Sequence, residues 1–186
     1  MFRSVLAAAA ASIVFLSTTA LAELPSLNKP LSVLSIADRG EMLLQDKEVS
    51  YRPWTSQSNL GEVHVLQYFA GTSSASKIFE PFTDRLQKEF PQRGYHVTTV
   101  INLDAAMWGT GGFVTGEAKS SKKKYPDSTM VLDEDGAGAA NWELGKKGAV
   151  LVVMDRAGSI IYLARKAMSE QDIAATINLV RDSIDS

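Results

Sequence analysis

The chain has 186 residues, of which 45% are hydrophobic and 22% charged, a composition typical of one globular domain. Its 19 Lys and Arg residues nearly balance its 21 Asp and Glu residues, so it lacks the basic excess that nucleic-acid binding requires. It contains no cysteine, which excludes disulfide bonds and every activity that depends on a thiol.

The first 22 residues have the parts of a secretory signal peptide. A basic residue comes early, residues 5–16 are almost wholly apolar, and a small-x-small cleavage signal ends at Ala22. The apolar run is shorter than the roughly 20 residues that span a bilayer, which favours cleavage before Glu23 over an uncleaved membrane anchor. We therefore predict a signal peptide at 1–22 and one domain at 23–186. The domain would be exported to the periplasm of a Gram-negative cell, with no stable membrane insertion after cleavage.

The first part of this domain is expected to be an extended arm with a small N-terminal β-hairpin. Residues 38–41 (Asp-Arg-Gly-Glu) are a turn signal between two short apolar segments. Residues 50–62 are interpreted as a polar connector with Trp54 as its bulky anchor. The hairpin is expected to lie against the body of the domain.

Two central strands and a helix between them follow. Residues 63–69 are predicted to form the first long strand, and residues 95–104, which are rich in β-branched side chains, the second. The apolar residues of the intervening helix recur at steps of three and four: Ile78, Phe79, Phe82, Leu86 and Phe90. The pattern begins near Ser76, but Pro81 removes a backbone donor and clashes with the preceding turn. The helix must therefore kink at this proline or start late.

Several features that resemble metal, phosphate or anion sites are interpreted as structural. His64 and His96 lack a second metal-type ligand at a useful spacing, so both are expected to be hydrogen-bonded or exposed. Gly109–Gly112 lacks the Lys-Ser/Thr pair and the glycine spacing of phosphate loops, so we expect a flexible loop there. Residues 129–136 are predicted to form a short strand and a turn, whose carboxylates lack the later ligands of a calcium loop. The basic run 122–124 is typical of a solvated face.

The last third of the chain has the clearest pattern. Residues 149–155 and 159–165 are apolar segments joined by a tight turn, which predicts an antiparallel hairpin. Ser169 and Asp172 have the spacing of a capping box, and the apolar residues after them line one face of a terminal helix: Ile173, Ile177, Val180 and Ile184. A parallel crossover followed by a final hairpin predicts an α/β fold, a three-layer sandwich with helices on both faces of a mixed central sheet.

These motifs resemble those of thioredoxin-fold proteins. In thioredoxins a strand leads into Trp-Cys-x-x-Cys-Lys, and a helix-kinking proline follows the second cysteine. In this chain Ser73 and Ser76 occupy the cysteine positions, Lys77 follows, and Pro81 lies at the matching distance. The mature chain resembles more closely the YtfJ-type family, exported bacterial proteins of unknown function with a thioredoxin-like fold. The segments that carry this closer resemblance are residues 52–71, residues 123–136 and Trp142.

The resemblance also implies that the redox machinery is absent. Serines replace both cysteines, Gln67 takes the place of the buried strand aspartate, and Ala149 takes the place of the cis-proline before the final hairpin. A serine hydroxyl has a far higher pKa than a thiol and cannot form a disulfide. We therefore expect the fold without thiol oxidoreductase or peroxidase activity, and no cofactor.

The candidate site is the small-residue elbow after the first long strand, together with the position of the lost cis-proline: Thr72, Ser73, Ser74, Ala75, Ser76, Lys77 and Ala149. Unpaired backbone N–H groups at a helix N-terminus could hold a carboxylate or another anion there. Alternatively, Ser73 simply caps the helix. Catalysis by Ser73 or Ser76 would need a base, for which Lys77 is the only nearby candidate.

We therefore predict a non-redox periplasmic binding module. It would hold an extended peptide or a periplasmic protein partner in a groove between the elbow and Ala149. An enzyme with non-thiol chemistry at Ser73–Ser76 is the alternative. Transcriptional regulation is the least favoured function, because the signal peptide and the lack of a basic face both argue against it.

Overall fold

A seven-stranded mixed sheet forms the centre of the computed structural model, which describes residues 22–46, 48–91, 94–106 and 109–186. The strands lie in the order β2-β1-β5-β4-β3-β6-β7. In chain order the elements are β1 (Ser35–Gln45), β2 (Glu48–Thr55), β3 (Val63–Ala70), α1 (Glu80–Glu89), β4 (Tyr95–Asn102), α2 (Gly111–Lys124), β5 (Thr129–Asp133), α3 (Ala137–Asn141), β6 (Val150–Met154), β7 (Ile160–Ala164) and α4 (Glu170–Asp185). None of the helices in these ranges has the length and apolarity needed to cross a membrane.

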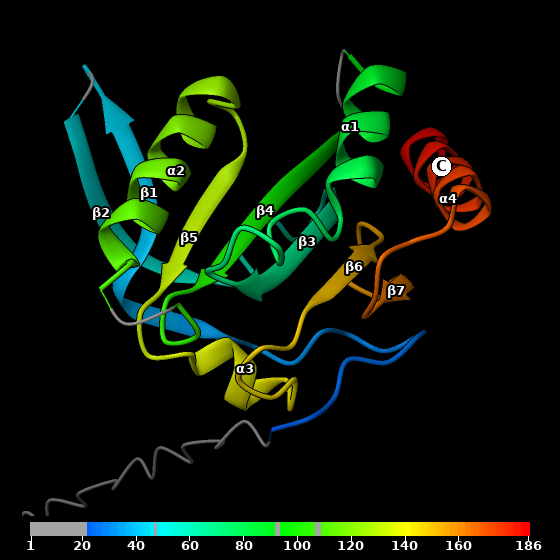
Figure 1. The fold of residues 1–186 in the computed structure, drawn as a ribbon. Coiled ribbons are helices and arrows are strands. Elements are labelled where there is room, and N and C mark those ends of the chain that lie inside the picture. The colour runs from blue at the N-terminus through cyan, green and yellow to red at the C-terminus, as the bar shows by residue number, and fades with distance from the viewer. Residues whose placement is uncertain (1–21, 47, 92–93, 107–108) are drawn as a thin grey trace, which may run out of the picture.

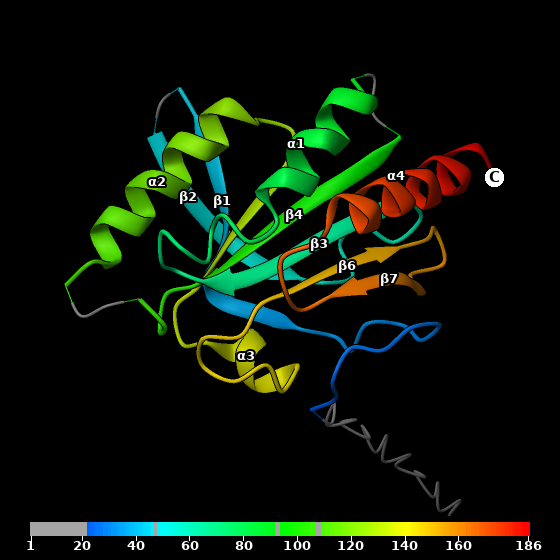
Figure 2. The same cartoon turned by 45° about the vertical axis from the view of Figure 1, so that its right-hand side comes forward.

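Three neighbouring strands, β3, β4 and β5, run parallel, and a helix links each strand to the next. Parallel crossovers are right-handed in nearly all proteins. The crossover from β3 to β4 and the one from β4 to β5 move in the same direction across the sheet. α1 and α2 therefore lie on the same face, as Figures 1 and 2 show. α4 packs beside α1 on this face, which we call the helical face.

The opposite face is covered by the short helix α3 and by the N-terminal arm, residues 22–34 (Figure 1). Leu31 and Leu34 of the arm pack with Trp142, which follows α3, in a second apolar cluster. The Trp142 indole N–H donates to the Ser32 carbonyl over 3.0 Å. The predicted three-layer α/β sandwich is confirmed, with its helices divided unevenly between the two faces.

Successive residues of the central strands point to opposite faces of the sheet. In β3, Val65 and Phe69 pack beneath the helices, whereas Leu66 and Tyr68 pack beneath α3 and the arm. β4 pairs with β3 in register, so its odd-numbered residues also face the helices. These odd-numbered positions are the ones available to line a site on the helical face.

The N-terminal hairpin is present, but its boundaries differ from the prediction. Residues 38–41 do not form the turn, because they lie within β1, at a bulge in the pairing with β2. Gly40 has a φ of 64° there, and an added Cβ would collide with the Arg52 carbonyl oxygen. The turn comes later, at Asp46. The predicted connector instead contains most of β2, in which Trp54 is buried.

The predicted flexible loop at Gly109–Gly112 is also wrong, because α2 begins at Gly111. This helix has few apolar residues and is rich in glycine, serine and lysine. Val114 and Ala118 bury themselves against the sheet, and such tertiary packing provides most helical stability in proteins. The final hairpin and the terminal helix with its capping box are confirmed.

Candidate functional site

A groove of about 700 Å³ lies on the helical face between α1 and α2, and we call it the α1/α2 groove. Its floor is largely apolar and comes from the three parallel strands, with Phe69, Val97, Ile101 and Met130 among its residues. Its walls carry polar and charged side chains: Glu80, Thr83, Asp84 and Gln87 on α1, and Glu117, Ser120 and Ser121 on α2. This volume is in the range of known ligand pockets, about 300–1,000 Å³.

Part of the apolar floor is reachable from solvent, since the two helices do not close over β4. Tyr95 and Val97 are only half-buried, and Phe113 on α2, which also lines the groove, is 63% exposed. An accessible apolar surface with a polar border is typical of binding sites.

The predicted elbow borders this groove and contributes part of its lining. Three elbow residues line the groove: Thr72, Ser76 and Lys77. The other predicted site residues lie outside the lining: Ser73, Ser74, Ala75 and Ala149. Ala75 and Ala149 are buried in the core, so the groove runs from the elbow between the two helices and not toward Ala149.

The elbow does not begin a helix, and Ser73 is not a helix cap. α1 starts after Phe79, whose side chain makes no capping hydrogen bond, and Pro81 lies in the first turn. The helix therefore starts late, which is one of the two outcomes that Pro81 predicted. The N–H groups of the elbow are thus not those of a helix N-terminus, and the physical basis for the predicted anion site is absent.

The small residues of the elbow instead form turns that they stabilise themselves. Thr72 Oγ1 accepts from the Ala75 N–H over 3.3 Å, and the Thr72 carbonyl accepts from the Ser76 N–H over 3.1 Å. Ser76 Oγ donates to the Ser73 carbonyl over 3.1 Å. Among the described residues, Lys77 donates to neither serine, so the elbow holds no nucleophile paired with a base.

Both histidines are hydrogen-bonded, as predicted. His64 Nε2 lies 2.8 Å from Thr98 Oγ1, and His96 Nε2 lies 2.9 Å from Thr129 Oγ1. Burial, followed by the charge of His96, lowers the pKa of His64 to about 3. Within the part of the chain that the structure describes, no group of three or more metal-type side chains occurs.

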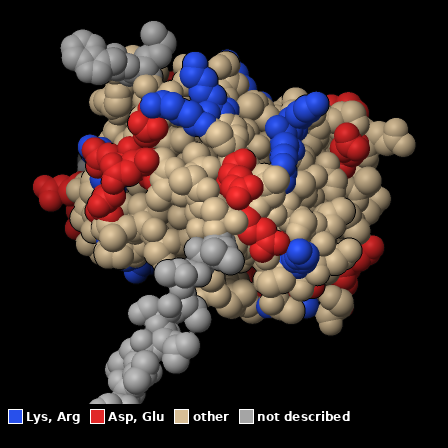
Figure 3. Space-filling view, turned by 90° about the horizontal axis from the view of Figure 1, so that it is seen from below, with Lys and Arg blue, Asp and Glu red and all other residues tan. Residues whose placement is uncertain are grey.

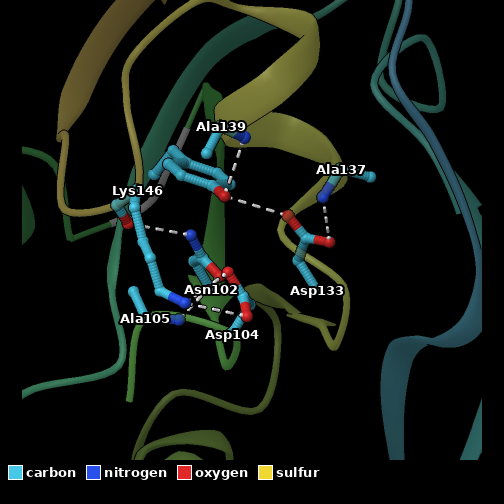
Figure 4. A network of polar contacts seen from close by, with 8 residues as sticks. Asn102, Asp104, Ala105, Asp133, Ala137, Ala139 and Lys146 are labelled. Carbon is cyan, nitrogen blue, oxygen red and sulfur yellow. Dashed lines mark hydrogen bonds and ion pairs between the residues drawn. The ribbon is translucent and has the colours of Figure 1, made fainter. Parts of the chain in front are cut away.

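A buried polar network joins β3 to α3 on the opposite face of the sheet (Figure 4). The Tyr68 hydroxyl donates to Asp133 Oδ2 over 3.0 Å and accepts from the Ala139 N–H over 2.9 Å. Asp133 also accepts from the N–H groups of Ala137 and Gly138. Burial, and then the charge of Asp133, raise the pKa of the Tyr68 hydroxyl. The sequence assigned Asp133 to an acidic turn, but it is a buried acceptor that holds α3 in place.

Sequence reasoning missed the acidic walls of the groove: Glu80, Asp84 and Glu117. Asp84 was expected on the solvated face of the predicted helix, Glu80 was not singled out, and Glu117 fell in a segment where no helix was expected. Had a helix been predicted at 111–124, right-handed crossovers would have placed it beside the first helix on one face of the sheet. The carboxylates of both helices could then have been expected near one another.

The fold is the thioredoxin-like fold. Similar solved structures include a thiol peroxidase from Chromobacterium violaceum (TM-score 0.56, 11% identity, 88% of this chain and 90% of that chain). Another is the thioredoxin domain of a thiol-disulfide oxidoreductase from Bacteroides vulgatus (TM-score 0.53, 12% identity, 83% of this chain and 96% of that chain). These identities show the fold alone. Fold and sequence together define a thioredoxin-fold protein without cysteines.

The chain belongs to a family of bacterial proteins of unknown function, YtfJ_HI0045, whose model matches residues 26–183. The uncharacterized protein YtfJ of Escherichia coli K12 is 31% identical over 149 residues, which cover 80% of this chain and 81% of that protein. An uncharacterized protein of Haemophilus influenzae is 32% identical over 155 residues, 83% of this chain and 84% of that protein. The resemblance seen in the sequence motifs is confirmed.

Proposed function

We propose that this chain is a non-redox periplasmic protein that binds an extended segment of a partner protein in the α1/α2 groove. The observation that carries the proposal is the groove itself, whose apolar floor is partly open to solvent between two polar walls. The absence of cysteine and of a serine–base pair in the described elbow favours binding over catalysis.

The elbow is proposed to contribute to the same site. Thr72 and Ser76 supply hydroxyl groups, and Lys77 supplies a cation for which the described residues offer no ion-pair partner. A segment lying between the helices would thus meet polar groups beside α1 as well as the apolar floor.

The periplasmic location rests on the N-terminal sequence. The apolar run at 5–16 and the cleavage signal before Glu23 are typical of exported chains. A partner in the same compartment is therefore part of the proposal.

DNA binding, the least favoured alternative, finds little support in the distribution of charge. Acidic and basic side chains are interspersed on the face seen in Figure 3. Binding to a duplex draws its affinity from a basic surface that releases counterions from phosphates.

Site-specific photo-crosslinking in intact cells tests the proposal. A photo-reactive amino acid at the position of Gln87, which lines the groove, should form a protein adduct. The same amino acid at the neighbouring Lys88, which lies outside the lining, should form little. No adduct at the first position, or equal yields at both, would contradict the proposal.

A further inference from the structure

We infer that the segment bound in the α1/α2 groove carries a basic side chain among its apolar ones. The inference rests on the proposed function and specifies its ligand. Three carboxylates line the walls, Glu80 and Asp84 on α1 and Glu117 on α2. Lys77 is the only lysine or arginine among the described lining residues. The lining therefore favours a cationic partner.

These three carboxylates have no ion pair or side-chain hydrogen bond among the described residues, whereas the arginines nearby are already engaged. Arg85 and Arg181 both pair with Glu89, over 2.9 and 3.3 Å. The remaining described arginines also have partners, either carboxylates or backbone carbonyls: Arg39, Arg52, Arg156 and Arg165. The groove carboxylates therefore have no direct ion-pair partner in the described part of the chain, and a cationic ligand could supply one.

The lysines near the end of α2 form no ion pair with the groove carboxylates among the described residues, although the charge of one of them acts on two of these carboxylates. The prediction of a solvated basic face is wrong for Lys122, which is buried. Its ammonium group donates to the carbonyls of Pro126 and Ser128, over 2.9 and 2.6 Å. Lys124 lies over the ring of Tyr125, 4.8 Å from its centroid. Its pKa is raised first by Tyr125 and also by the charges of Asp84 and Glu80, so Lys124 offsets part of the negative charge of α1 without pairing with either carboxylate. Neither lysine is part of the lining.

The groove also offers hydrogen bonds that suit a peptide backbone. The side chains of Gln87 on α1 and Ser121 on α2 have no hydrogen-bond partner among the described residues. On the floor, Gln67 donates its amide N–H to Thr99 over 2.8 Å, which leaves its carbonyl oxygen available. A peptide supplies matching N–H and C=O groups along its length, whereas the hydrocarbon tail of a lipid supplies none. An extended peptide with apolar and basic side chains therefore satisfies the floor and both walls.

Calorimetric titration of the purified protein tests the inference with three short peptides blocked at both ends. In the first, leucine alternates with lysine, and glutamine or glutamate replaces lysine in the other two. At low salt the lysine peptide should bind about fivefold to tenfold more tightly than the glutamine peptide, since each partly exposed ion pair contributes modestly. The glutamate peptide should bind most weakly. Salt at about 1 M should remove most of these differences.

Substitutions in the groove test whether its carboxylates cause the preference for the lysine peptide. Asp84→Asn and Glu117→Gln should each bring the affinity for the lysine peptide closer to that for the glutamine peptide. Asp182→Asn, an exposed change on α4 outside the lining, should leave it unchanged. Gly116→Trp, which adds bulk to the lining of the groove, should abolish binding of every peptide.

The possible failures are distinguishable. Equal affinities for the three peptides, all lost in Gly116→Trp, would overturn the charge inference and leave the groove as a binding site. Binding that survives Gly116→Trp would place the peptide elsewhere and overturn the inference. Tighter binding of the uncharged detergent dodecyl maltoside than of the lysine peptide would also overturn it. If no peptide binds, the charge inference fails, while the crosslinking from Gln87 still decides the proposed function.

Discussion

At the residue scale, His64 links the stability of the fold to pH. Its imidazole is buried beside Thr98, and its pKa in the folded protein is lowered to about 3. In the unfolded chain the imidazole binds a proton below about pH 6.5. The unfolded state therefore binds more protons between these values. The free energy of unfolding falls as the pH drops from about 6.5 toward 3, by at most about 1.4 kcal/mol per pH unit.

We predict that His64→Gln removes this part of the pH dependence. From about pH 7 to about pH 5, the wild type should lose about 2 kcal/mol more stability than the variant. Urea unfolding of both proteins at the two pH values measures the difference. Equal losses would show that His64 titrates normally in the folded protein.

The network around Tyr68 yields a second prediction at this scale. Tyr68→Phe leaves the Ala139 N–H without its acceptor and Asp133 without one donor, so the free energy of unfolding should fall by about 1–3 kcal/mol. Tyr51→Phe is the matched control, because Tyr51 is exposed on β2 and should change stability by less than about 0.5 kcal/mol. Urea unfolding measures both. A loss no larger than that of the control would mean that the buried network contributes nothing.

At the scale of elements, the start of α1 determines what Pro81 does. A proline in the first turn has no intrahelical hydrogen bond to lose, whereas a proline in a helix interior is unfavourable by about 3 kcal/mol. Since α1 begins at Glu80, Pro81→Ala should lower the free energy of unfolding by about 0.4–1 kcal/mol, through the greater freedom of the unfolded chain. Urea unfolding measures the sign. A stabilisation near 3 kcal/mol would show that the helix continues back through the elbow.

The sequence predicted those helices and strands whose apolar residues follow the spacing of the element that they form. β3, β4, β6 and β7 are apolar runs, and α4 has both a capping box at its N-terminus and an apolar face along its length. α2 was missed because only Phe113, Val114 and Ala118 are apolar in it, so its helical state depends on packing and not on periodicity. The first hairpin was displaced because Gly40 permits a bulge as readily as a turn.

At the scale of the whole molecule, the elbow was predictable and the groove was not. The resemblance pointed to Thr72, Ser76 and Lys77, which line the groove. The acidic walls come from two helices that are distant in sequence, and their separation above β4 is a matter of tertiary packing. Local pattern carries no information on how far apart two packed helices lie.

Export is also a property of the whole chain. If the interpretation of the first 22 residues holds, protein recovered from the periplasm of a Gram-negative host should begin at Glu23. Intact-mass measurement of the recovered protein reads this directly. A mass that includes residues 1–22, or recovery in the cytoplasmic fraction alone, would refute export.

The most direct test of the central claim, that the α1/α2 groove is the binding site, is to fill it. Gly116 lines the groove on α2, and an added Cβ there meets no heavy atom within 4 Å. Gly112 has the same open space on the same helix but lies outside the lining. The measurement is the adduct yield from the photo-reactive residue at Gln87, with thermal melts as the folding control. The account predicts that Gly116→Trp abolishes the adduct and that Gly112→Trp retains it. A folded Gly116→Trp protein with the wild-type adduct yield would contradict it.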